Sequence, residues 1–263
     1  MTAKIGFIGI IGELWKEDPQ GTLEWLQGLG IDGMEGGAAV ANAFGVDPAA
    51  GREKLAAHGL SCPIQGRVSF GQSEDEMRQV LALARAMGAA YVVDYFAPFN
   101  DRDEILRYCE YFNRAGALCA QEGLVFLYHN HDHEFRRFDG EYGLDIMLDN
   151  TDPALVKQEL DVAWVTFGGA DPVAYLKKRA DRCPVLHMKD FERLHPGSPT
   201  AEGVRQEAVF AEVGTGVVDT AGVVAAAKET GVDWLVIEQD RMNALGPRES
   251  LEKSVAELKR LVG

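Results

Sequence analysis

The stretch from Leu124 to Phe135, LVFLYHNHDHEF, carries the densest group of residues in this chain that can bind metals or move protons. An apolar run typical of a β-strand ends in three histidines at alternate positions, His129, His131 and His133. Strand side chains alternate between faces, so these histidines share one face for as long as the strand continues. A polar loop that happens to carry histidines is the alternative. The change from apolar to ligand-rich favours an enzyme strand that ends at an active site.

Three later apolar segments end in residues of the same kind. Asp161 follows QEL, His187 lies within VLHMKD, and Glu238 ends WLVIE. Burial of Asp161 without a partner would be costly, which favours a site role. A lone His among apolar residues is more often a hydrogen-bonded core residue, but the neighbouring carboxylates favour His187 as a ligand. Such a set suits Mn²⁺, Mg²⁺, Co²⁺ or Fe²⁺ better than a structural zinc site.

Two further polar residues belong to these segments. Glu159 shares a strand face with Asp161, so we expect it one layer deeper, paired with Lys189 or another cation. Lys189 shares a face with His187 and is a candidate contact for substrate or phosphate. Both side chains are therefore predicted to lie near the site.

Other candidates at the ends of predicted strands are Glu35 and Asp94. Trp15 and Trp164 are candidate walls of a sugar pocket, although core packing is the commoner use of such aromatics.

Strand-like runs alternate with helical patterns along the whole chain. The eight candidate strands begin near positions 4, 33, 61, 91, 124, 157, 185 and 235. This alternation indicates βαβ units and a parallel sheet. Eight units of about 30 residues each predict an α/β fold, a (β/α)₈ TIM barrel, as a single domain over residues 1–263.

The segments between these strands contain recognisable helix signals. Ser73 and Glu76 form a predicted capping box, a helix is expected over 102–121, and Pro172 is expected to begin another. The unit after the seventh strand is longer than the others. Its segment 192–212 is rich in Gly, Pro and charge, and we expect it to be a lid over the site.

Composition excludes several classes of protein. The 263 residues carry a net charge of −15, which argues against nucleic acid as a partner because phosphate binding relies on Lys and Arg. The four cysteines lack CxxC spacing and are expected to be reduced thiols. No apolar run approaches the ~18 residues of a membrane span, and the start of the chain lacks signal-peptide features. We therefore expect a cytoplasmic protein without a membrane partner; its oligomeric state, including a homo-oligomer, stays open.

The motifs YHNHDHEF, ELDVAWV, LHMKD, EVGTG and IEQD, in this order and spacing, resemble the sugar phosphate isomerase/epimerase family. This family of xylose-isomerase-like TIM barrels also includes inosose dehydratases, ketose 3-epimerases and the endonuclease IV group. The resemblance covers essentially the whole chain. It implies one divalent metal, Mn²⁺ first and Mg²⁺, Co²⁺, Fe²⁺ or Zn²⁺ as alternatives. The implied ligands are Glu, Asp, His and Glu on strands five to eight.

Three of these ligands carry over directly, onto Asp161, His187 and Glu238. For the fourth, the ketose epimerases have a Glu about where this sequence has His129. We expect Glu134 to fold back and supply that ligand, with His129 as the rival and otherwise near the substrate.

The function expected from this resemblance is a metal-dependent isomerase or epimerase of a sugar, keto-sugar or related polyol. A metal would polarise a carbonyl while a base moves the proton beside it. The expected catalytic residues are Glu134, Glu238 and His131, with His129, Lys189, Trp164 and Trp15 at the substrate.

The same residues leave three alternative functions open. A lyase of the inosose-dehydratase type, or a deglycosidase, would use the same site, and the His-x-His motif slightly favours it. A nuclease is disfavoured by the net charge, and a non-catalytic sugar-binding barrel by the nearly complete ligand set.

Overall fold

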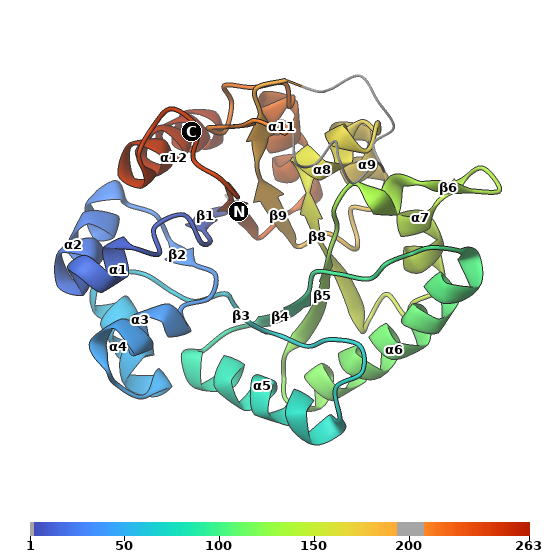
Figure 1. Ribbon diagram of the computed structural model, residues 1–263, viewed down its shortest axis with the longest axis horizontal. Coiled ribbons are helices and arrows are strands. Elements are labelled where there is room, and N and C mark those ends of the chain that lie inside the picture. Colours follow the sequence, from blue (N-terminus) through green and yellow to red (C-terminus); the bar gives the residue numbers. More distant parts are fainter. Residues whose placement is uncertain (1–2, 194–207) are drawn as a thin grey trace.

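Eight parallel strands form one sheet in the order β2-β1-β12-β9-β8-β5-β4-β3 in this computed structural model, which describes residues 3–193 and 208–263. A parallel bridge from Gly33 of β2 to Ser61, just before β3, nearly closes the sheet into a barrel (Figure 1). The barrel strands are β1 Lys4–Phe7, β2 Gly33–Met34, β3 Ile64–Arg67, β4 Tyr91–Asp94, β5 Val125–His129, β8 Val156–Asp161, β9 Val185–Met188 and β12 Trp234–Ile237. The predicted TIM barrel is confirmed.

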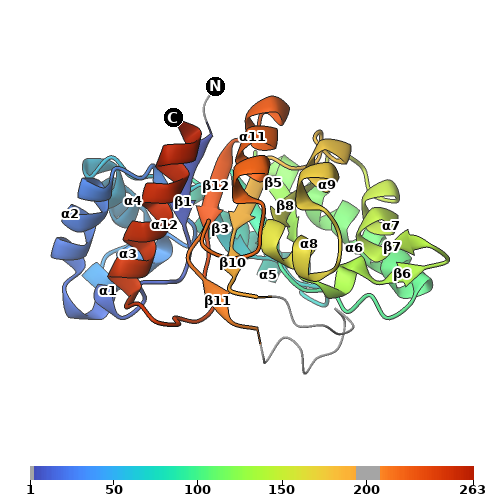
Figure 2. The same cartoon turned by 90° about the horizontal axis from the view of Figure 1, so that it is seen from above.

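Helices surround these strands on the outside, as two perpendicular views show (Figure 1 and Figure 2). They are α1 Leu14–Glu17, α2 Pro19–Leu29, α3 Ala38–Phe44, α4 Pro48–Ala57, α5 Glu74–Met87, α6 Arg102–Gln121, α7 Gly143–Asp149, α8 Val162–Phe167, α9 Pro172–Lys178, α11 Thr220–Thr230 and α12 Pro247–Val262. A short 3₁₀ turn, η1 His133–Phe135, completes the described elements together with two antiparallel strand pairs. These are β6 Arg137–Phe138 with β7 Glu141–Tyr142, and β10 Asp190–Phe191 with β11 Phe210–Ala211.

The helix boundaries follow local chemistry that is visible in the sequence. The predicted capping box is present: Ser73 accepts from the Glu76 amide, and Glu76 accepts from the Ser73 amide. Helix α6 has the predicted bounds, and Pro172 begins α9 behind the cap Asp171. Gly88, which ends α5, has a φ of 74°, a backbone conformation that favours glycine.

Apolar side chains fill the barrel interior below the site. This layer is formed by Ile64, Val93, Leu127, Val185, Trp234 and Val236. A strand repeats its orientation every second residue, so the residue two positions after an interior side chain also points inward. His129 follows Leu127, His187 follows Val185, and Glu238 follows Val236 in this way. The same alternation that buries the core therefore carries ligands to the barrel mouth.

Two predicted strands end earlier than expected. Strand β8 stops at Asp161, and the following residues form helix α8 instead of continuing the strand to Val165. The reason is that Oδ1 of Asp161 caps this helix, accepting from the amides of Ala163 and Trp164 at 2.9 Å. Strand β5 stops at His129, so only the first of the three alternate histidines lies on a strand.

The predicted lid, 192–212, lies mostly outside the described residues. Its two ends are described: the Glu192 amide donates to the Val209 carbonyl at 2.8 Å, next to the antiparallel pair β10–β11. All four cysteines are buried and free of disulfides. Within the described ranges, every helix is too short or too polar to cross a bilayer.

Candidate metal centre

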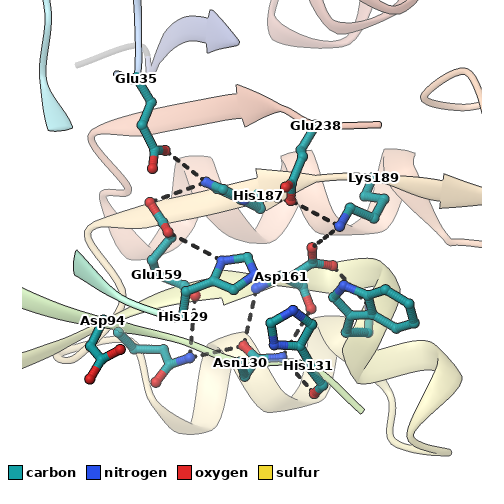
Figure 3. Close-up of polar contacts among 12 residues, drawn as sticks. Glu35, Asp94, His129, Asn130, His131, Glu159, Asp161, His187, Lys189 and Glu238 are labelled. Carbon is teal, nitrogen blue, oxygen red and sulfur yellow. Dashed lines mark hydrogen bonds and ion pairs between the residues drawn. The ribbon is translucent and has the colours of Figure 1, made fainter. Parts of the chain in front are cut away.

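The carboxyl ends of β8, β9 and β12 bring Asp161, His187 and Glu238 together. Asp161 and His187 are direct register partners on adjacent strands, and Glu238 follows the last residue of β12. Together with His129, these residues offer one ligand atom each, and all four atoms lie within 4.8 Å of one another. Figure 3 shows the four side chains converging from separate strands. This arrangement provides two imidazole nitrogens and two carboxylate oxygens for one cation.

The fourth member of this cluster is His129, whereas we expected Glu134. The carboxylate of Glu134 is fully buried and accepts hydrogen bonds from the Tyr128 hydroxyl at 2.7 Å and the His131 amide at 2.9 Å. Nδ1 of His133 lies 3.3 Å from its second oxygen. The turn η1 holds Glu134 at these partners, and Glu134 is not a member of the cluster. Glu134, expected as a ligand and a catalytic residue, is thus found neither in this cluster nor, among the described residues, in the lining of the cavity above it; its carboxylate anchors the loop that holds His131.

A cavity of about 260 Å³ opens over the cluster. It is lined by Ile8, Glu35, Val93, Tyr95, His129, His131, Glu159, His187 and Glu238. Two of the expected catalytic residues, Glu238 and His131, are thus exposed to the same small space. Of the lining residues, Ile8, Val93 and Tyr95 were not among our candidates. The inward orientation of Val93 could have been predicted from the alternation of side chains along β4.

A second group of ligand atoms overlaps the first at His187. Its other members are Glu35 and Glu159, and the three ligand atoms again lie within 4.8 Å of one another. Nε2 of His187 lies 3.0 Å from Glu35 and 3.1 Å from Glu159, while Nδ1 lies 2.9 Å from Glu238. We expected Glu159 to pair with Lys189 or another cation. Its partners are the two histidines, since its other oxygen lies 3.2 Å from Nδ1 of His129.

Lys189 lies behind the cluster and does not line the cavity. Its Nζ is 2.9 Å from Glu238, 3.3 Å from Asp161 and 3.2 Å from Asp240, and the residue is 2% exposed. The partners of Lys189 are thus carboxylates, two of them in the cluster, and its expected contact with substrate stays a prediction.

Both tryptophans expected at the substrate are buried. Trp15 belongs to the apolar core and is not among the residues that line the cavity. Trp164 lies in α8, with its ring 5.0 Å from Nζ of Lys189 and 5.7 Å from the His131 ring. Trp164 therefore packs beside His131 of the cavity and beside Lys189, and Trp15 packs in the core.

Asn130 is a buried residue of the site that the sequence analysis did not select. Its Oδ1 accepts from the Asp161 amide at 3.1 Å and from Nε2 of Gln158 at 2.9 Å. Asn130 thus ties the loop after β5 to the end of β8, and its place between two histidines was the only indication in the sequence.

A family model described as a xylose isomerase-like TIM barrel matches residues 23–261. The chain belongs to this family. Curated relatives include an inosose dehydratase of Geobacillus thermodenitrificans, 30% identical over 144 residues, which are 51% of this chain and 46% of the relative. Another, from Halalkalibacterium halodurans, is 32% identical over 93 residues, 35% of this chain and 30% of the relative. The chain spans about half the length of these curated relatives where they match it best.

Solved structures share the fold over nearly the whole chain. A sugar phosphate isomerase/epimerase from Parabacteroides distasonis has a TM-score of 0.78 at 23% identity, covering 99% of this chain and 100% of the other. The IOLI protein, with a zinc atom bound, has a TM-score of 0.76 at 16% identity and covers 98% of each chain. At these identities the likeness establishes the barrel architecture.

The electrostatics of the xylose isomerase-like site favour a bound cation. Burial alone would raise the pKa of Glu159, but the charge of His187 and the hydrogen bond from His129 lower it to about 2. Burial and the nearby charge of Glu159 raise the pKa of Glu35 to about 7. Against the opposing effect of burial, Lys189 and His187 hold the pKa of Glu238 well below its usual range. The carboxylates of Glu159 and Glu238 are thus held ionised, each beside a different ring nitrogen of His187.

One orphaned atom tests whether these residues fit a metal. Oδ2 of Asp161 is buried and makes no hydrogen bond within the described structure, although Nζ of Lys189 lies 3.3 Å away. Buried carboxylate oxygens are normally satisfied by donors or by a metal. An unsatisfied oxygen beside two imidazoles and a second carboxylate fits the donor set of a divalent cation.

Proposed function

We propose that this chain is a metal-dependent enzyme that moves the proton adjacent to a carbonyl in a sugar, keto-sugar or related polyol, acting as an isomerase or epimerase. The observation that carries this proposal is the convergence of His129, Asp161, His187 and Glu238 beneath a cavity that His131 also lines. A divalent cation held there would supply Lewis acidity to the carbonyl.

The two-nitrogen, two-oxygen donor set bears on the choice of metal. Imidazole ligands suit Zn²⁺, Fe²⁺ and similar ions, whereas all-oxygen sets suit Mg²⁺ and Mn²⁺. With His129 in the place expected for Glu134, we propose Zn²⁺, Co²⁺ or Fe²⁺ ahead of Mn²⁺. The zinc atom in the structurally similar IOLI protein supports this order.

We propose His131 as the group that takes the substrate proton. It lines the cavity and is not one of the four clustered residues that would bind the metal. The buried carboxylate of Glu134 accepts from its backbone amide and fixes the position of the residue. An imidazole titrates near neutral pH and can both accept and return a proton.

The charge of the cavity favours a substrate without phosphate. Among the described residues that line it are three glutamates and no lysine or arginine. Proteins normally bind a phosphate group with Arg, Lys or backbone amides. Lys189 already pairs with three carboxylates. We therefore propose a neutral polyol ketone.

A lyase is the second candidate, favoured by His129 in the cluster and by the curated relatives named inosose dehydratase. The same base would remove the proton beside the carbonyl. The β-hydroxyl would then depart with a proton as water, and a carbon–carbon double bond would form next to the carbonyl.

One experiment separates these activities. Protein loaded with Zn²⁺, Co²⁺ or Mn²⁺ is incubated in D₂O with neutral ketoses, keto-glycosides and inososes, and the products are analysed by NMR and mass spectrometry. Deuterium next to the carbonyl in a product that keeps all of its oxygens indicates isomerisation or epimerisation; loss of one water indicates a lyase. His131→Asn should abolish the exchange while retaining the metal. Absence of exchange with every metal would contradict the proposal.

A further inference from the structure

Two neighbouring aromatic side chains, Tyr95 and Phe96, are exposed directly after β4, at the mouth of the barrel. Within residues 3–193 and 208–263 four large apolar side chains are exposed, and these are two of them, at 45% and 48%. Tyr95 lines the cavity over the proposed metal centre, as does Val93 two positions before it. Exposed apolar surface next to a cavity is typical of a ligand-binding site.

The ring of Tyr95 is held in place from one side. The guanidinium of Arg67 lies over it, 3.8 Å from the ring centroid, and Nε of Arg67 donates to the buried carboxylate of Asp94 at 3.3 Å. A ligand in the cavity can therefore reach only the opposite face or the edge of this ring. One face of a sugar ring consists of C–H groups, which pack well on an aromatic surface. Tyr95 thus offers a fixed apolar wall in a cavity that is otherwise lined mainly by glutamates and histidines.

Phe96 lies beside the cavity, on the side of the loop that follows β5. Its ring centroid is 5.6 Å from that of His133, and the His133 ring lies 6.2 Å from that of His131. His131 lines the cavity, whereas Phe96 is not among the described residues that line it. Phe96 is therefore close to the imidazole proposed as the base, but it faces ligand atoms that lie outside the cavity.

The size of the cavity decides how much of a ligand lies outside. Ligand pockets usually measure about 300–1,000 Å³, so a cavity of about 260 Å³ suits a single sugar ring. We propose that the substrate is a glycoside: Tyr95 packs against the sugar ring within the cavity, and Phe96 contacts an apolar aglycone that projects from it. This inference rests on the proposed function, because it names the substrate class of the same site. A free monosaccharide would leave Phe96 without a contact.

The test compares methyl and phenyl 3-keto-glycosides of gluco, galacto and manno configuration, so that the members of each pair differ only in the aglycone. Isothermal titration calorimetry with Zn²⁺-loaded protein gives the dissociation constants, and NMR in D₂O follows exchange of the proton beside the ketone. In at least one pair we expect the phenyl glycoside to bind about 3- to 10-fold more tightly. Phe96→Ala should reduce this preference to less than about twofold, and Tyr95→Ala should weaken binding of both members by about tenfold.

Phe70→Ala is the matched control. Phe70 is 54% exposed in the loop after β3, but its ring lies 4.7 Å from that of Tyr108 and 5.4 Å from that of Tyr111, both in α6. This variant should keep the preference for the phenyl glycoside. Circular dichroism establishes that all three variants are folded, as expected for side chains this exposed.

Equal affinities within every pair, or a preference that Phe96→Ala leaves intact, would overturn the inference. Analytical ultracentrifugation of Phe96→Ala adds one outcome: loss of a dimer together with an intact preference would assign Phe96 to a contact between copies of the chain and would also overturn it. Preferential binding without proton exchange would uphold the glycoside site and reject the proposed reaction. Proton exchange with equal affinities would do the reverse.

Discussion

Nζ of Lys189 lies 2.9 Å from Oε2 of Glu238, which pairs a buried ammonium with a carboxylate of the proposed metal centre. The same ammonium lies 3.3 Å from Oδ2 of Asp161, so it contacts two carboxylates of the proposed metal centre. Burial lowers the pKa of Lys189, but the surrounding carboxylates raise it further, so the group stays charged. Lys189 therefore helps to keep the carboxylate of Glu238 ionised.

Replacing Lys189 by Met should destabilise the protein strongly, because buried carboxylates would lose their cation. We expect the free energy of unfolding in urea at pH 7 to fall by about 3–5 kcal/mol. Lys253→Met is the control: Lys253 pairs with Glu212 at 3.1 Å, but its side chain is 48% exposed. That variant should lose less than about 1 kcal/mol. Equal losses in the two variants would show that the buried position of Lys189 contributes nothing.

Replacing His129 by Asn should remove a metal ligand, whereas Glu134→Gln should not. We expect His129→Asn to lose bound zinc by more than the 10- to 100-fold typical of supporting residues. Glu134 contacts Tyr128 and the loop backbone, so its variant should retain the metal. Metal content after dialysis, measured by mass spectrometry, distinguishes the two. Loss of zinc from Glu134→Gln alone would restore Glu134 as the ligand.

We expect the ionisation of Asp94 to make the stability of the protein depend on pH. Its side chain is fully buried at the end of β4, and Oδ2 makes no hydrogen bond within the described structure. Burial raises its pKa to about 6, although Arg67 at 3.3 Å opposes the shift. An acid whose pKa is raised in the folded state lowers the free energy of unfolding when it ionises. This loss grows as the pH rises from the pKa of the unfolded chain, about 4, through the pKa of the folded state.

Asp94→Asn removes that ionisation. We therefore expect the stability of the variant relative to the unmodified protein to increase by about 1 kcal/mol from pH 5 to pH 8. Urea unfolding at the two pH values measures this difference. A difference between the two proteins that does not change with pH would contradict the assignment.

We expect Asp190 to stabilise the turn that contains the EVGTG motif. Its carboxylate accepts from four backbone amides, those of Phe191, Gly214, Gly216 and Val218. In Asp190→Asn an amide NH₂ would face N–H donors, and we expect a loss of about 2–3 kcal/mol and a fall in Tm of roughly 5 °C or more.

Asp219→Asn is the matched control for this prediction. Asp219 is exposed and caps α11 by accepting from the Gly222 amide at 3.0 Å, a role that Asn fulfils equally well. Its Tm should change little. Similar Tm values for the two variants would show that the Asp190 contacts are not important for stability.

The barrel and three of the four clustered ligands could be predicted from sequence because both depend on local periodicity. Strand-like runs about 30 residues apart specify parallel βα units. Within each strand the period of two carries the inward orientation of Val185 to His187, and that of Val236 to Glu238. These relations need only the sequence of one strand at a time.

The fourth member of the cluster was decided by tertiary structure. The period of two holds only while the strand continues, and β5 ends at His129. Beyond it, the direction of the chain depends on contacts with distant residues, such as Asn130 with the Asp161 amide and His133 with the Ala97 carbonyl. These contacts place Glu134 against Tyr128 and leave His129 beside Asp161. Likewise, Lys189 meets Glu238 only because barrel packing places β9 beside β12, a neighbour relationship that no single segment of sequence encodes.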